Sequence, residues 1–282
     1  MDRRTFLKTT AITAGAAAFA ANMPQAHAGE FTGKIKKAVK YNMVRAGKTP
    51  KEKLQILKDI GFDGVEPSFR DKVDPEELKA ASDEVGLPIH GCVLGSVDGI
   101  PAAVDRAKLY GASSVLLVAG RVDENTPYEK NYIETQATIR DAIPYAKEQD
   151  ILLLVENVWN NFLLTPLEMR RYLDELESDQ VGCYLDLGNM VRFGWPEHWI
   201  PVLDGRVKKL DIKEYSREKQ KNEGLWNGFK VDIGEGSVDW AACRRELKKI
   251  GYTGWATAEV GGGDEKHLAD VAARMDRVLD LA

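Results

Sequence analysis

Short apolar runs alternate along the chain with longer segments that carry apolar residues at helical spacing, from about residue 38 to the C-terminus. This alternation is typical of repeated βα units, whose successive strands lie parallel in one sheet. Eight of the apolar runs have the length and composition of strands. They span residues 38–44, 64–69, 88–94, 114–119, 151–156, 181–187, 207–213 and 254–260.

The segments between these runs carry start and stop signals for helices. A capping residue followed by proline, or an acid before a helical segment, marks a start. Such starts are Thr49-Pro50, Asp74-Pro75, Thr126-Pro127, Thr165-Pro166 and Asp239. Glycine ends several helices because it adopts the left-handed conformation without strain. These stops are Gly61, Gly86, Gly111 and Gly251.

Eight evenly spaced strand and helix pairs predict one α/β domain, a (β/α)8 TIM barrel over residues 29–282. An open, doubly wound sheet is the alternative. It would need a glycine-rich phosphate loop after its first strand, and residues 41–47 do not provide one. The longest irregular stretch, residues 216–238, contains Trp226 and Phe229, and we expect it to form an ordered loop over the active face.

Residues 1–28 are predicted to be a twin-arginine export signal and not part of the fold. Arg3-Arg4 precede a weakly apolar, alanine-rich stretch, and Ala26-His27-Ala28 provides a cleavage site before Gly29. The stretch is shorter than the roughly 20 residues of a membrane-spanning helix, and a short amphipathic or anchoring helix is the alternative. We therefore expect a periplasmic or other extracytoplasmic protein with no stable membrane span after signal removal.

The charge of the chain indicates which partners to expect, and its cysteine content indicates whether disulfide bonds are expected. The formal net charge is −5, and loss of the signal, with its three basic residues and one acidic residue, makes it −7. The chain has no basic stripe or arginine-rich tail, so nucleic acid is not expected as a partner. Cys92, Cys183 and Cys243 are too few for a disulfide framework, and we interpret them as buried apolar residues. The sequence is compatible with a homo-oligomer and does not indicate its oligomeric state.

Carboxylates end or follow the apolar runs of the last four predicted strands, at Glu156, Asp186, Asp211 and Glu259. In a (β/α)8 barrel the catalytic groups lie at the carboxyl ends of the strands. Each acid alone has an ordinary explanation, as a helix cap or a partner of lysine. Four converging carboxylates, however, repel one another unless a cation lies between them. An all-oxygen site favours Mn²⁺, then Mg²⁺, then Zn²⁺ or Co²⁺.

The motifs resemble the xylose isomerase-like TIM barrels, over the whole of the mature chain. The resemblance rests on residues 61–66 (GFDGVE), 155–157 (VEN), 184–189 (YLDLGN), 211–215 (DIKEY) and 234–240 (GEGSVDW). It implies a divalent metal held by Glu156, Asp186, Asp211 and Glu259. One position departs from the family pattern, in which a histidine stands where this chain has Asp211. The replacement adds negative charge and favours harder ions.

The resemblance also implies a sugar isomerase or epimerase acting on a small carbohydrate. Glu156 and Glu259 would face each other across a ketose or keto-sugar and move a proton through an ene-diolate. A lyase or dehydratase of 3-keto-glycosides or inososes would use the same groups, and export favours it. A non-catalytic carbohydrate-binding barrel is the alternative from another class. A repair nuclease like endonuclease IV would need more histidines than this chain has.

Further polar residues near strand ends are candidates for binding the substrate, namely Glu66, His90, Asn189, Lys213 and Arg217. Some have alternatives: a helix-capping acid for Glu66, a core histidine for His90, and an exposed surface residue for Arg217. Lys213 lies two residues beyond Asp211 and points to the same face of the strand, where it would also neutralise carboxylates. Four tryptophans offer faces for sugar rings, and the sequence does not distinguish among Trp159, Trp195, Trp226 and Trp255.

Overall fold

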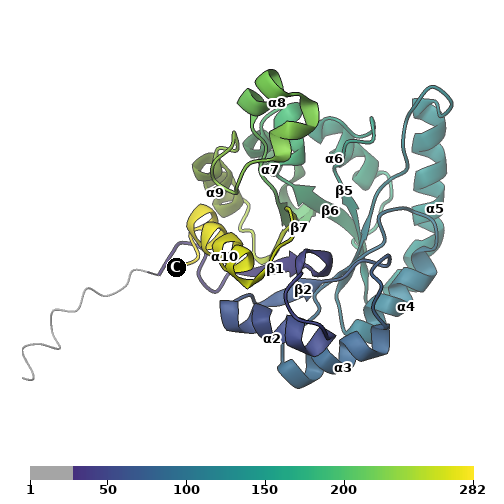
Figure 1. Cartoon of the computed structure of the whole chain (residues 1–282). Helices are drawn as coiled ribbons and strands as arrows, with labels where there is room; N and C mark the ends of the chain where they lie inside the picture. The colour runs from purple at the N-terminus through teal and green to yellow at the C-terminus, as the bar shows by residue number, and fades with distance from the viewer. Residues whose placement is uncertain (1–27) are drawn as a thin grey trace, which may run out of the picture.

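Eight parallel strands form a nearly closed barrel in the computed structural model, which describes residues 28–282 (Figure 1). Around the sheet the order is β2-β1-β8-β7-β6-β5-β4-β3. Isolated parallel bridges, Val65↔Ile89 and Ser68↔Val93, connect the β2 and β3 segments and complete the ring. The predicted TIM barrel is confirmed. The strands are β1 (Ile35–Lys40), β2 (Gly64–Glu66), β3 (Cys92–Val93), β4 (Ser114–Leu117), β5 (Leu152–Glu156), β6 (Val181–Asp186), β7 (Val207–Ile212) and β8 (Gly254–Ala258).

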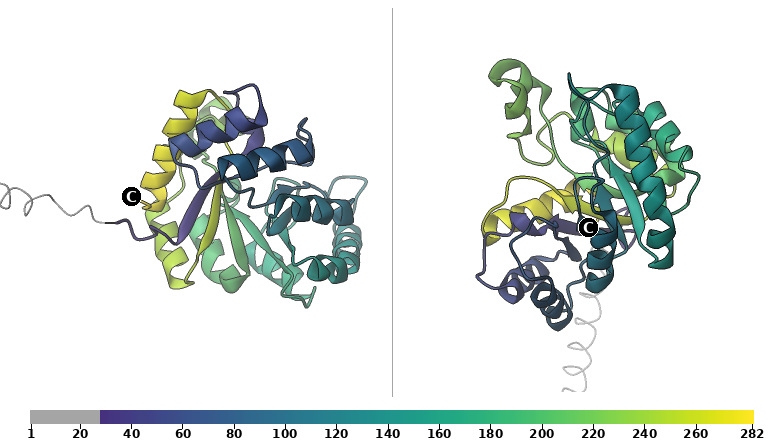
Figure 2. Two further views of the ribbon diagram at one scale, coloured as in Figure 1. Left: turned by 90° about the horizontal axis from the view of Figure 1, so that it is seen from below. Right: turned by 90° about the vertical axis from the view of Figure 1, so that its right-hand side faces the viewer.

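Nine α-helices surround the barrel within residues 28–282. They are α2 (Pro50–Ile60), α3 (Pro75–Val85), α4 (Ile100–Tyr110), α5 (Tyr128–Glu148), α6 (Pro166–Asp174), α7 (Pro196–Leu203), α8 (Arg217–Glu223), α9 (Trp240–Lys249) and α10 (Glu265–Leu279). One helix, α8, is additional to the expected eight. With the 3-10 helix η5 (Leu225–Phe229) it occupies the segment predicted to be an irregular loop, and the pair stands out from the rest of the molecule (Figure 2).

Most predicted helix ends are where the sequence signals placed them. Thr49 caps α2 with a reciprocal box, in which its hydroxyl accepts from the Glu52 amide at 3.2 Å and the Glu52 carboxylate accepts from the Thr49 amide at 3.3 Å. Gly61 ends the same helix at a φ of 98°, a conformation that suits glycine. Helix α5 begins one residue later than expected, because Pro127 is its cap and Tyr128 its first residue.

Most predicted strands end at a different residue in the structure, and the first three differ most. The second strand ends at Glu66, three residues before the predicted end at 69. The first strand starts earlier than predicted and stops at Lys40, where the chain turns into the 3-10 helix η2 (Tyr41–Met43). Tyr41 and Met43 are buried in that turn, so the apolar run continues past the strand and conceals its end. Regular pairing in the third strand is confined to Cys92–Val93, within the predicted 88–94.

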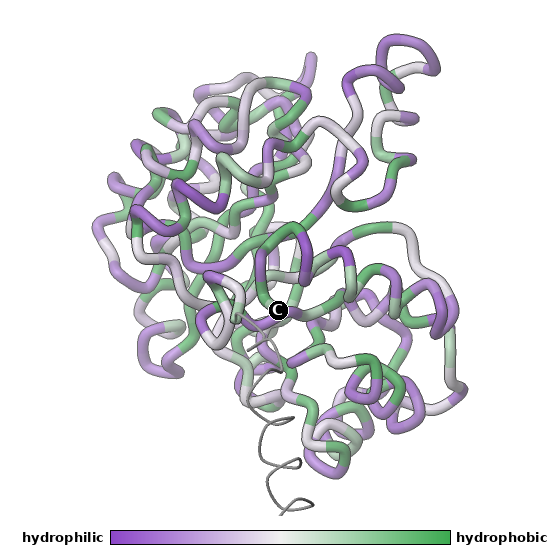
Figure 3. Tube along the Cα trace, turned by 90° about the vertical axis from the view of Figure 1, so that its left-hand side faces the viewer, coloured by the Kyte–Doolittle hydropathy of each residue, from purple (hydrophilic) through white to green (hydrophobic). Residues whose placement is uncertain are grey.

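Apolar faces of the helices pack onto the outside of the barrel and form one large core, which includes Leu54 and Leu57 of α2 and Met275 of α10. Figure 3 shows hydrophobic and hydrophilic positions alternating along these helices, as expected for helices with one buried face. The three cysteines are buried and unpaired, as predicted. Among residues 28–282, no helix is long and apolar enough to cross a membrane. Residues 1–27, with nearly all of the predicted export signal, lie outside the described part.

Candidate active site

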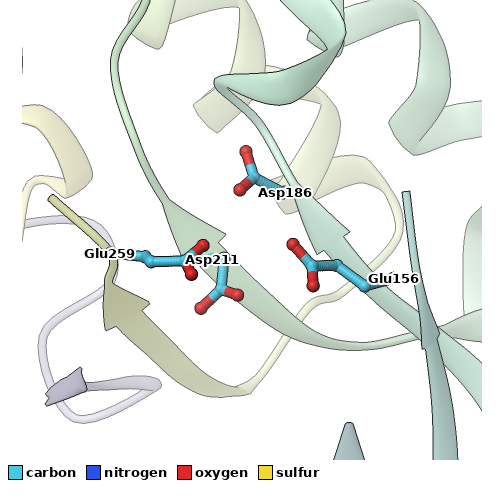
Figure 4. A group of neighbouring side chains, drawn as sticks. All are labelled: Glu156, Asp186, Asp211 and Glu259. Carbon is cyan, nitrogen blue, oxygen red and sulfur yellow. The ribbon is translucent and has the colours of Figure 1, made fainter. Parts of the chain in front are cut away.

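Four carboxylates converge at the carboxyl ends of the last four strands. Glu156 ends β5, Asp186 ends β6, Asp211 lies near the end of β7, and Glu259 directly follows β8. Each offers one oxygen that lies within 4.8 Å of those of the other three. Glu156 and Glu259 approach from opposite sides, with Asp186 and Asp211 between them (Figure 4). The structure thus brings together the four acids that the sequence predicted as metal ligands.

The strand register explains this convergence. Asp186 and Asp211 are direct partners across the β6–β7 ladder, so they end at the same height in the barrel. The Glu259 amide donates to the Ile212 carbonyl at 3.1 Å, which holds the start of the β8 loop beside β7. Parallel strands in register place their carboxyl ends at one rim, and side chains there face a common centre.

Burial and mutual repulsion shift the protonation of the cluster. Burial raises the pKa of Glu156 well above its ordinary value, and the charges of Glu259 and Asp211 add to the effect. The pKa of Asp211 is also raised well above its usual range by burial, although Lys40 opposes the shift. At Glu259 burial acts in the same direction, but Lys213 and Lys40 outweigh it and lower the pKa. The two glutamates therefore lie in environments with opposite effects on ionisation.

Two lysines contact the acids directly. The Lys213 ammonium lies 3.0 Å from Asp186 Oδ2 and 2.8 Å from Glu259 Oε2. Lys40, the last residue of β1, lies 2.9 Å from Asp211 Oδ1 and 2.6 Å from Glu66 Oε2. Lys213 was a predicted site residue. Lys40 was missed, because the predicted first strand ran past it and a lysine inside a strand gave no sign of facing the barrel interior.

The cluster retains acceptor capacity for a cation. Within residues 28–282, Asp211 Oδ2 is buried and has no hydrogen-bond donor, whereas Asp211 Oδ1, Asp186 Oδ2 and Glu259 Oε2 are buried and contacted by a lysine ammonium. Carboxylate oxygens have more than one lone pair, so an ion pair with a lysine does not saturate them. Buried acceptors without donors are costly, and a hard divalent ion such as Mn²⁺ or Mg²⁺ would satisfy them. The residues present therefore fit a divalent metal site.

Two asparagines hold the acids in place. The Asn157 amide group donates to the Asp186 carbonyl and accepts from the Asp186 amide, both at 2.8 Å, which locks the ends of β5 and β6 together. The Asn189 amide N–H donates to Asp186 Oδ1 at 2.7 Å, and its side chain donates to Glu156 Oε1 at 3.4 Å. Asn189, predicted to bind substrate, contacts the carboxylates. The motifs 155–157 and 184–189 contained both asparagines, although Asn157 was not predicted as a site residue.

Two other predicted substrate ligands lie in the barrel interior. Glu66 is fully buried and accepts from Lys40 and, at 2.9 Å, from the Tyr184 hydroxyl. His90 is also buried, and burial lowers its pKa well below the usual value, so the ring is neutral. Its Nε2 lies 3.0 Å from Thr257 Oγ1. Both side chains make contacts within the protein, and a role in substrate binding stays a prediction for them.

Arg217 lies in the first turn of α8. The contacts of its guanidinium are with residues other than the four carboxylates. Its guanidinium donates to the Val191 carbonyl at 3.0 Å and to the Gly194 carbonyl, and it covers the Trp195 ring at 4.7 Å from the centroid. These contacts tie α8 to the segment that follows β6. The predicted role of Arg217 as a substrate clamp also stays a prediction.

A sequence profile of the xylose isomerase-like TIM barrel family matches residues 54–278. The chain belongs to this family, as the sequence motifs predicted. A search among curated proteins gave no match.

Solved structures of sugar epimerases share the fold. The 3-keto-D-glucoside 4-epimerase YcjR from E. coli superposes with a TM-score of 0.73 at 17% identity, over 86% of this chain and 100% of the other. The D-allulose 3-epimerase from Methylomonas sp. superposes with a TM-score of 0.67 at 18% identity, over 91% of this chain and 97% of the other. An L-ribulose 3-epimerase superposes with a TM-score of 0.67 at 17% identity, over 88% of this chain and 92% of the other. Identities this low establish the common barrel.

Proposed function

We propose that this protein is a divalent-metal-dependent isomerase or epimerase of a ketose or keto-sugar. The observation that carries the proposal is the pair of glutamates, Glu156 and Glu259, facing each other across a cluster that has unsatisfied carboxylate oxygens. Similarity in fold to enzymes named as epimerases of allulose, ribulose and 3-keto-glucoside supports the choice of substrate class.

Glu156, Asp186, Asp211 and Glu259 would hold the cation. When bound, a divalent cation supplies a Lewis acid for the oxygens of a carbonyl and its neighbouring hydroxyl. One glutamate removes the proton from the carbon beside the carbonyl, which gives an ene-diolate, and the other returns a proton on the opposite face. Lys213, held by Asp186 and Glu259, keeps a positive charge where the substrate oxygens gain negative charge.

A lyase acting on a 3-keto-glycoside is the second candidate. Proton removal beside the ketone is the same first step, and loss of a neighbouring group replaces reprotonation. The exposed aromatic side chains beside the site, Phe193 and Trp226, favour a substrate larger than one sugar ring. Identification of the product, an epimer or an unsaturated sugar, separates the two activities.

The proposal is tested by metal analysis and by deuterium exchange. Purified protein is expected to contain a stoichiometric divalent cation and to incorporate solvent deuterium beside the carbonyl of ketoses or 3-keto-glycosides. Glu156→Gln and Glu259→Gln should each slow the exchange by about 10²-fold or more. Glu148→Gln, an exposed acid at the end of α5, is the matched control. A Glu259→Gln variant that binds metal and keeps full turnover would contradict the acid/base assignment. Absence of both metal and exchange would favour a carbohydrate-binding barrel.

We also propose export through the twin-arginine pathway, on the basis of Arg3-Arg4 and the alanine-rich stretch that follows. The N-terminal residue of the processed protein should be Gly29 or a near neighbour. Replacing both arginines with lysine should leave the unprocessed protein in the cytoplasm. Export that is unaffected by this change would refute the proposed route.

A further inference from the structure

Lys40 connects the carboxylate cluster to the polar interior of the barrel. Its ammonium lies between Asp211 Oδ1, at 2.9 Å, and Glu66 Oε2, at 2.6 Å. The lysine side chain is 7% exposed and both acids are fully buried. Because water is largely excluded here, solvent screens the ion pair little. The Lys40 ammonium therefore attracts the Asp211 carboxylate strongly.

The surrounding residues hold Lys40 in this position. Glu66 Oε2 also accepts from the Tyr184 hydroxyl at 2.9 Å, and the Tyr184 ring lies 4.8 Å from the lysine nitrogen. The same hydroxyl lies 2.8 Å from Thr257 Oγ1, which in turn lies 3.0 Å from His90 Nε2. These contacts fix Glu66, and Glu66 fixes Lys40. These contacts place the ammonium beside Asp211.

Asp211 needs this counter-charge more than its neighbours do. In the described part of the chain, Lys40 contacts Asp211 Oδ1 and no donor reaches Asp211 Oδ2, whereas Asp186 also accepts a hydrogen bond from the Asn189 amide. We propose that Lys40 is the built-in counter-ion of Asp211, shared with Glu66, so that the three groups carry one net negative charge instead of the two that the acids alone would carry. Lys40 thereby limits the affinity of the cluster for divalent cations. This inference rests on the proposed metal site.

The test is titration of metal-free protein with Mn²⁺, followed through the electron paramagnetic resonance signal of the free ion. Lys40→Met removes the counter-charge and is expected to tighten Mn²⁺ binding by about tenfold or more, while the metal-free protein melts at a lower temperature. In an Asp211→Asn background, the same lysine substitution should change the affinity by less than about threefold, because the proposed ligand that Lys40 contacts is then uncharged and its other partner, Glu66, is not a proposed ligand.

Lys209→Met is the matched control. Lys209 is buried in the same barrel interior, but it contacts the His90 ring and carbonyl instead of a carboxylate of the cluster. Its loss should change Mn²⁺ affinity by less than about threefold. If Lys40→Met does not fold, Lys40→Gln retains a hydrogen-bond donor for Glu66, and tighter binding is expected there too.

Unchanged or weaker Mn²⁺ binding in the folded Lys40 variant would overturn the counter-ion role, and so would equal tightening in Lys209→Met. If the wild-type protein binds no divalent cation, the proposed function itself fails. The same titration therefore distinguishes failure of the counter-ion role from failure of the proposed function.

A second inference concerns an aromatic rim, defined as Trp159, Phe193, Trp226 and Phe229. Trp159 lies at its centre, with ring centroids 6.1 Å from Phe193, 5.1 Å from Trp226 and 4.7 Å from Phe229. Phe193 is 37% exposed and Trp226 68% exposed, although folding usually buries such side chains. The rim combines residues that follow β5, β6 and β7.

The rim is continuous with the carboxylate cluster. The Trp159 indole donates to the Asn189 carbonyl at 2.9 Å, and the Asn189 side chain reaches Glu156. On the other side, the Lys213 ammonium lies 5.6 Å from the Phe229 ring centroid while it contacts Asp186 and Glu259. We infer that the rim binds the second ring of a glycoside whose keto ring lies at the carboxylates. This inference deepens the proposed function and depends on it.

Substrate comparison tests the rim. Trp226→Ala should lower kcat/KM for deuterium exchange into a 3-keto-disaccharide by about tenfold and leave the value for the 3-keto-monosaccharide unchanged, because only the larger substrate reaches the rim. Ile133→Ala, at an exposed position on α5, is the control. Equal effects on both substrates, no effect, or a change of oligomeric state in Trp226→Ala would overturn the assignment. Wild-type protein without exchange on either substrate would instead refute the proposed function.

Discussion

Glu214 holds together the loop between β7 and α9, and its replacement is the sharpest test of the architecture around the site. Its buried carboxylate accepts four hydrogen bonds. Oε1 accepts from the amides of Tyr215 and Val238, at 3.1 and 3.2 Å. Oε2 accepts from the Gly234 amide at 2.9 Å and the Trp240 indole at 2.8 Å. One side chain therefore fixes residues on both sides of the loop.

Glu214→Gln keeps the shape of the side chain and removes two of its acceptor sites. Whichever way the amide turns, its NH₂ group faces two N–H donors that then have no acceptor. Charge-assisted hydrogen bonds contribute about 1.5–3 kcal/mol each, so losing two should lower the free energy of unfolding by about 3–6 kcal/mol. Trp240→Phe removes a single donor and should cost about 1–2 kcal/mol.

Urea unfolding, followed by far-ultraviolet circular dichroism, measures these costs. Glu218→Gln, at an exposed position on α8, is the control and should stay within about 0.5 kcal/mol of wild type. In the Glu214→Gln background, Trp240→Phe should cost at least about 1 kcal/mol less than in wild type, because the two groups bond directly. A Glu214→Gln cost below about 1 kcal/mol would mean that the four donors do not depend on this carboxylate, and would contradict its role in holding the loop.

Gly236, Lys209 and Asp186 each give a further testable prediction. Gly236→Ala would place a Cβ 2.4 Å from Glu214 Oε1, so it should lower the free energy of unfolding by about 1–3 kcal/mol, and an unchanged urea midpoint would contradict this. Burial lowers the pKa of Lys209 from 10.5 to about 8, so the unfolded chain binds more protons between these values. Stability should therefore rise with pH across that window by up to about 3 kcal/mol, and Lys209→Met should lose this rise. Chelation of divalent cations should lower the melting temperature of the wild-type protein and leave that of Asp186→Asn unchanged, whereas equal responses would count against Asp186 as a ligand.

Local patterns predicted much of the fold and the identity of the candidate ligands. The capping box at Thr49 and the glycine stop at Gly61 act within one helical turn, so they can be recognised from the sequence without tertiary structure. Acids such as Glu156 and Asp186 stood out because they end apolar runs, and parallel strands end at one rim. These inferences need only neighbouring residues and the general geometry of a barrel.

The positions of charged residues in the barrel interior were decided by tertiary structure. Lys40 lies on the first strand and Asp211 on the seventh, and their ion pair depends on how the strands are staggered around the ring. The sequence likewise did not indicate that Glu214 would hold residues 234–240, or that Trp226 would join Trp159 beside the site. The order of residues alone shows which strands end in acids. Only the folded barrel decided which lysine balances which acid, because contacts between distant segments follow from strand register and not from local pattern.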